Sequence, residues 1–225
     1  MQGNDLITLV VGLPLLWIAT WLAFRGSLCG KLLMTGTLGF FLYTYMSMAT
    51  LASYNALFLV YVVIFALSFY AFILSMMSFD LEALPQAFSK KLPHGWIASL
   101  MFLVGGFLLL AWLGRIVPPL FQGETPILEN TTTLVIQFMD LGLIVPLAFL
   151  GGILLLRRHA WGYLLSSIML TKGITLGLGV SAMAINMVRM GVADSLGIMV
   201  PFLVITLLNI VMVTVLLRNV EIHRG

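Results

Sequence analysis

Thr133–Leu156 reads TLVIQFMDLGLIVPLAFLGGILLL, a run in which Asp140 lies deep among apolar side chains. A helix of about 20 mostly apolar residues crosses the hydrocarbon core of a bilayer, and this stretch is long enough to do so. A charge at such depth costs several kcal/mol unless it is paired or hydrated. The stretch therefore predicts a transmembrane helix that carries a buried polar site.

The rest of the chain repeats this apolar character. Of the 225 residues, 61% are hydrophobic and 8% are charged, whereas soluble domains carry about 25% charged residues. We therefore predict an all-α integral membrane protein, with residues 1–225 forming a single seven-helix domain. The other six predicted spans are Leu6–Phe24, Leu33–Leu51, Ala56–Met77, Trp96–Val117, Ala160–Met187 and Leu196–Leu217.

Basic residues gather on one side of the predicted helices. Eight lie in alternate connections or the tail (Arg25, Lys31, Lys90, Lys91, Arg157, Arg158, Arg218 and Arg224), and two lie on the opposite side (Arg115 and Arg189). The positive-inside bias then places the N-terminus outside and the C-terminus in the cytoplasm of a multi-pass protein of the plasma membrane. The basic balance indicates this topology and contact with the lipid bilayer, not nucleic-acid binding.

An internal repeat is the next signal. A shift of the chain by 132 residues aligns a proline, an arginine and a glycine with their counterparts, in the pairs Pro14/Pro146, Arg25/Arg157 and Gly30/Gly162. This pattern predicts parallel three-helix repeats, 5–78 and 133–218, joined by helix 96–117. Such three-plus-one-plus-three layouts occur in transporters, including the sugar-transporting SWEET proteins, where binding sites lie between repeats. The alternative is a chance similarity of two leucine-rich hairpins.

Asp140 and Lys172 are the ionisable residues that lie deep within predicted spans. Helical periodicity places Gln137 near Asp140 and Thr175 near Lys172. The charges differ in depth by about 6 Å at about 1.5 Å per residue, so we predict a direct or water-mediated pair. Thr206 and Asn209 of the seventh span lie at a similar depth to Lys172 and are added to this ligand or ion site. The pair can equally serve only to fix the helix register.

No catalytic, cofactor or metal motif accompanies these charges. The three histidines, His94, His159 and His223, fall in predicted loops or the tail, and an enzymatic activity is not indicated. The favoured function is a small secondary transporter or exporter of a small solute or ion, with the site between the repeats. The alternative is a receptor, sensor or accessory subunit with a ligand or partner pocket. A retinal pigment is disfavoured because the seventh span has no lysine. The oligomeric state stays open.

Overall fold

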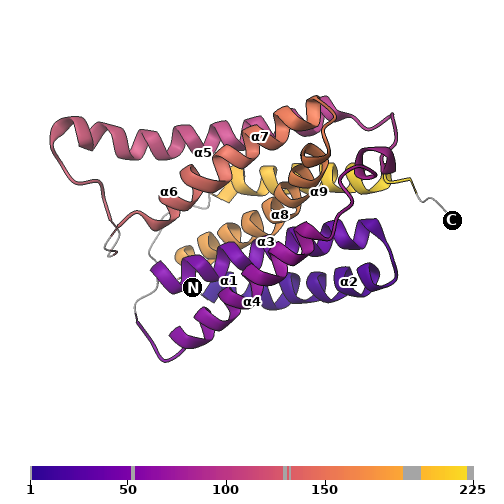
Figure 1. Cartoon of the computed structure of the whole chain (residues 1–225). Coiled ribbons are helices and arrows are strands. Elements are labelled where there is room, and N and C mark those ends of the chain that lie inside the picture. Colours follow the sequence, from indigo (N-terminus) through magenta and orange to yellow (C-terminus); the bar gives the residue numbers. More distant parts are fainter. Residues whose placement is uncertain (1, 52–53, 129–130, 132, 190–198, 222–225) are drawn as a thin grey trace.

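The computed structural model is helical and describes residues 2–51, 54–128, 131, 133–189 and 199–221 (Figure 1). Within these ranges seven helical spans are long and apolar enough to cross a membrane. The predicted all-α, seven-span architecture is therefore confirmed, and the chain is a polytopic membrane protein. The spans are Asp5–Phe24, Leu28–Leu51, Phe58–Met77, His94–Gln122, Val135–Leu156, Ala160–Ile185 and Val200–Arg218.

The first and fifth spans each pass through one π-helical turn. The first span comprises α1 (Gln2–Ile7), the π turn η1 (Thr8–Gly12) and α2 (Leu13–Phe24). The fifth comprises α6 (Val135–Met139), the π turn η3 (Asp140–Ile144) and α7 (Val145–Leu156).

Proline explains both π turns. Pro14 and Pro146 lie at the second position of α2 and α7, and a proline has no N–H to give to the carbonyl four residues earlier. The preceding residue instead bonds five residues back, which is the π-helical pattern. Leu13 N–H bonds to Thr8 O in the first span, and Val145 N–H bonds to Asp140 O in the fifth.

The remaining helices complete two three-span groups, which meet through α3 (Leu28–Leu51) and α8 (Ala160–Arg189). The others are α4 (Phe58–Met77), α5 (His94–Gln122) and α9 (Met199–Arg218). We call α1–α4 the first unit, in which α2 and α4 pack on α3, and α6–α9 the second unit, in which α7 and α9 pack on α8. Helices α3 and α8 pack against each other, and α5 packs on α7.

Some boundaries differ from those predicted. Helix α3 begins at Leu28 instead of Leu33, because Lys31 lies within its first turns without breaking the helix. Helix α5 continues through the two prolines near its end, 118 and 119, and ends at Gln122. The capping residue Gly123 follows with a φ of 70°, a left-handed conformation that glycine adopts readily. The predicted start of the seventh span, Leu196, lies outside the described residues.

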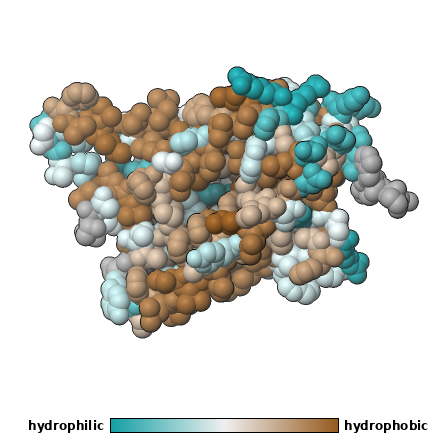
Figure 2. All heavy atoms as spheres, viewed as in Figure 1, coloured by the Kyte–Doolittle hydropathy of each residue, from teal (hydrophilic) through white to brown (hydrophobic). Residues whose placement is uncertain are grey.

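Hydrophilic side chains gather at one end of the bundle, where α9 also ends (Figure 2). This end contains the α2–α3, α4–α5 and α7–α8 connections. The long α4–α5 connection includes the 3₁₀ helix η2 (Leu84–Ala87). It is held by the chain after α9, because Ser89 N–H donates to Asn219 O at 2.7 Å and Glu221 N–H donates to Ala87 O at 2.8 Å.

Candidate functional site

Asp140 is the first residue of the π turn η3, and its side chain is only 3% exposed. Two aromatic side chains satisfy its carboxylate. The Tyr43 hydroxyl, from α3, donates to Oδ1 at 2.7 Å, and Trp112 Nε1, from α5, donates to Oδ2 at 2.9 Å. Hydrogen bonds to an ionised acceptor are among the stronger ones in proteins. The carboxylate therefore joins three helices that are distant in sequence.

Lys172 of α8 is 5% exposed and lies on the other side of the same tyrosine. Its Nζ is 3.7 Å from the centroid of the Tyr43 ring, within the range of a cation–π contact. A direct or water-mediated pair was predicted, and the described contacts run from Lys172 to the ring of Tyr43 and from the Tyr43 hydroxyl to Asp140. Axial depth could not predict this arrangement, because it carries no information about a side chain that enters from a third helix.

The other predicted site residues are distributed around this cluster. Thr175 is buried one turn from Lys172 and donates to its backbone carbonyl at 2.9 Å. Gln137 is buried on α6, one turn before Asp140. Neither side chain has a described hydrogen bond to the two charges, although both lie on the helical faces that the periodicity predicted.

Thr206 and Asn209 lie where α9 packs on α8. Their side chains donate to carbonyls of their own helix, at 2.6 Å to Phe202 O and 2.8 Å to Ile205 O. A Cβ added to Gly173 would lie 2.8 Å from Asn209 Oδ1, and one added to Gly177 would overlap Thr206 Oγ1. The small residues of α8 thus admit the polar side chains of α9, as in other membrane helix pairs. The suggested hydrogen bonds from these two residues to Lys172 are not formed.

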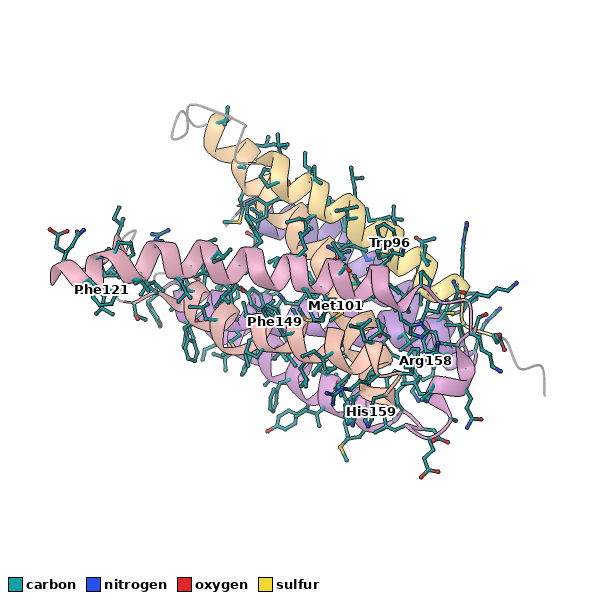
Figure 3. All side chains as sticks on the ribbon, turned by 90° about the horizontal axis from the view of Figure 1, so that it is seen from above. Trp96, Met101, Phe121, Phe149, Arg158 and His159 are labelled. Carbon is teal, nitrogen blue, oxygen red and sulfur yellow. The ribbon has the colours of Figure 1, made fainter. Side chains whose placement is uncertain are left out.

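An apolar cavity of about 60 Å³ lies between α5, α7, α8 and α9. Lys172 and Asn209 are the polar side chains of its lining, and the rest is apolar, including Met101, Phe107 and Phe202. Figure 3 shows Met101 on α5, over the region where α7 and α8 pack. A space of this size holds a few water molecules or a small apolar group.

Tyr43 and Trp112 are the two partners of Asp140 that sequence reasoning missed. Both lie in apolar runs, where aromatic residues are common as packing or lipid-facing groups. A usable signal exists, because a buried carboxylate needs donors and a buried tyrosine or tryptophan needs a partner for its O–H or N–H. A search for mid-span aromatic donors around Asp140 would have included these two residues.

Comparison of the chain with protein-family models, curated proteins and solved structures finds no match in any of the three.

Proposed function

We propose that the protein is a small secondary transporter whose ionisable site lies between two three-helix repeats. The observation that carries this proposal is the Lys172–Tyr43–Asp140 chain of contacts. Lys172 and Asp140 belong to the second unit, whereas Tyr43 belongs to the first. A movement of one unit against the other therefore changes the partners of both buried charges.

Backbone features at equivalent positions support the repeat. The π turns Thr8–Gly12 and Asp140–Ile144 differ by 132 residues, the same shift that aligns Pro14 with Pro146. The tight turns that follow also correspond. Gly26 and Arg158, again 132 apart, both have positive φ, 78° and 54°. Such agreement between sequence shift and backbone conformation favours a duplicated unit over chance similarity.

Close helix contacts repeat with the same spacing. A Cβ added to Gly30 would lie 2.5 Å from Leu22 Cβ and 2.6 Å from Ala23 N, so α3 approaches α2 closely. A Cβ added to Gly162 would overlap the backbone of 154–155, the positions equivalent to 22–23. Glycine is required at both positions by this close approach.

The contact between the units is reciprocal. A Cβ on Gly36 would lie 2.6 Å from Thr171 Cβ, and one on Gly39 would lie 3.4 Å from Ile168 Cγ2. Under the 132-residue shift, 36 corresponds to 168 and 39 to 171, so the two contacts are equivalent to each other. This reciprocity is what a two-fold axis between α3 and α8 produces. It supports parallel repeats related by an axis along the membrane normal.

The polar site breaks this symmetry. Asp140, Lys172 and Thr175 correspond to Thr8, Phe40 and Tyr43 in the first unit. The charges therefore belong to one repeat, and the aromatic residue that separates them belongs to the other. When the units rotate, Tyr43 leaves Asp140 and Lys172, and both charges become available to a solute or ion. Asp140 and Lys172 both lie near the middle of their spans, the depth that is typical of transporter sites.

The proposed orientation has the N-terminus outside and the C-terminus in the cytoplasm of the plasma membrane. The eight-to-two distribution of basic residues between the two sides supports this orientation. The hydrophilic end of the bundle in Figure 2 is then the cytoplasmic end.

Access to the cavity from the two sides of the membrane tests the transporter assignment without knowledge of the substrate. Leu176 lines the cavity beside Lys172, and Leu176→Cys in a Cys29→Ser background introduces a single thiol there. A membrane-impermeant sulfonated methanethiosulfonate is applied to right-side-out and to inside-out vesicles. Alternating access predicts labelling from both sides.

Leu164→Cys is the matched control, because Leu164 is a fully buried leucine of the same helix outside the cavity. It should not react from either side. Labelling of Leu176→Cys from one side only would favour the receptor, sensor or accessory function. If Leu176→Cys is labelled from neither side, the buried charges only stabilise the bundle.

A further inference from the structure

A second cavity, of about 520 Å³, lies at the hydrophilic end of the first unit. It is bounded by the end of α2, the start of α3, the end of α4 and the segment that leads into η2. Most of its lining is apolar, including Phe24, Met34, Phe79 and Leu84. Lys31 is the cationic side chain of the lining.

The Lys31 ammonium is held in place and keeps N–H donors for a further acceptor. Its Nζ donates to the backbone carbonyl of Ser78 and lies 4.7 Å from the centroid of the Phe79 ring. An ammonium group has three N–H donors, so one hydrogen bond leaves others for an acceptor. The contacts with Ser78 and Phe79 fix the cation at the mouth between α3 and α4.

The acidic residue of the lining, Asp80, is engaged locally. Its Oδ1 accepts hydrogen bonds from the backbone N–H groups of Glu82, at 3.0 Å, and Ala83, at 3.1 Å. These bonds stabilise the turn before η2, which is also held by the chain after α9. The wall of the cavity is therefore an ordered segment with its own hydrogen bonds.

The equivalent place in the second unit is closed by the chain itself. Lys31 corresponds to Tyr163 under the 132-residue shift. The Tyr163 ring stacks on Phe88 at 4.7 Å between centroids, and its hydroxyl is 2.9 Å from His94 Nε2, at the start of α5. Helix α5 also packs along α7 in the second unit. No described segment packs in this way on the first unit, where the cavity remains.

Exposed apolar side chains lie on α2 and α4, the two helices that end at this cavity. Phe24 of α2 is 88% exposed, and Leu74 and Met77 of α4 are 67% and 76% exposed. An amphiphile with an anionic head at Lys31 would thus lay its chains along α2 and α4.

We propose that this cavity binds one anionic phospholipid, with its phosphate on Lys31 and its acyl chains over α2 and α4. A cation at the end of an apolar, membrane-facing cavity matches the headgroup and the chains of such a lipid together. This site is remote from the Asp140 cluster, and it does not depend on transport.

Native mass spectrometry of the detergent-solubilised chain, titrated with phosphatidylglycerol or phosphatidylcholine, tests the site. Lys31→Gln keeps an N–H donor for Ser78 O but removes the charge, and it should weaken phosphatidylglycerol binding about fivefold. Lys31→Arg should retain binding. Lys91→Gln removes a cation from an exposed loop position and is the matched control, with no expected loss.

A cavity-filling variant separates the cavity from general charge attraction. Ala83 lines the mouth and is exposed, so Ala83→Phe should obstruct binding while Lys31 is retained. Equal loss with Lys31→Gln and Lys91→Gln, or unchanged binding by Ala83→Phe, would overturn the site. If glycerol 3-phosphate competes as well as the intact lipid, the cavity binds a free phosphate and the lipid assignment is wrong.

Discussion

The Tyr43 hydroxyl donates a hydrogen bond to Asp140 Oδ1 at 2.7 Å, and this bond links α3 of the first unit to the π turn of the second. The face of the same ring receives the Lys172 ammonium at 3.7 Å. One tyrosine therefore contacts both a buried anion and a buried cation, and both charges belong to the opposite unit.

Tyr43→Phe should destabilise the protein while preserving the ring beneath Lys172. A hydrogen bond to a charged group contributes about 1.5–3 kcal/mol, and Trp112 alone would remain as donor to the carboxylate. The free energy of unfolding, measured by SDS titration in mixed micelles, should fall by this amount. Tyr54→Phe, at a tyrosine that is 87% exposed, should change it little. Equal effects of the two variants would show that the Asp140 bond adds no stability.

Asp140→Asn and Lys172→Met should each cost more stability alone than together. Removal of one partner leaves an uncompensated buried charge, at a cost of about 3–5 kcal/mol. The double variant removes both charges, so its unfolding free energy should exceed that of either single variant. A double-mutant cycle measures this coupling. Strict additivity would mean that the two charges do not compensate one another through Tyr43.

The stable double variant also separates structure from function. If Leu176→Cys keeps its reactivity from both sides in this background, the charges are not needed for alternating access. Loss of labelling from one side, with stability retained, would place both charges in the moving site.

Gly30→Ala and Gly162→Ala should destabilise the bundle similarly, because each new methyl group meets the backbone of the preceding helix. Overpacking at such contacts costs about 1–3 kcal/mol. Gly106→Ala is the matched control. Nothing lies within 4 Å of its added Cβ, and alanine inside a helix gains about 0.5–1 kcal/mol over glycine. Clearly unequal losses at 30 and 162 would argue against equivalent repeats.

Glu124→Cys should react with an impermeant maleimide from outside intact cells, and Lys90→Cys should react only after permeabilisation. Both are made in the Cys29→Ser background, which lacks any other cysteine. The expectation follows from the distribution of basic residues. The reverse pattern of labelling would invert the proposed topology.

The seven spans could be predicted because hydropathy and length are local properties. In a bilayer each backbone N–H and C=O must bond within its own helix, so an apolar run of sufficient length has little alternative to a helix. Asp140 and Lys172 stood out for the same reason, as charges in runs that exclude charge. The end of α5 was placed too early, at Val117, because proline lowers helix propensity but does not forbid a last turn.

The partners of the charges were decided in three dimensions. Tyr43 lies 97 residues from Asp140 in the chain, and its sequence neighbourhood resembles any packed aromatic run. The contact exists because α3 and α8 pack closely at small residues, which brings α3 near the π turn of the fifth span. Apolar composition favours the insertion of a helix into the membrane. Because lipid and helix surfaces are equally apolar, composition alone does not determine which helices pack against each other.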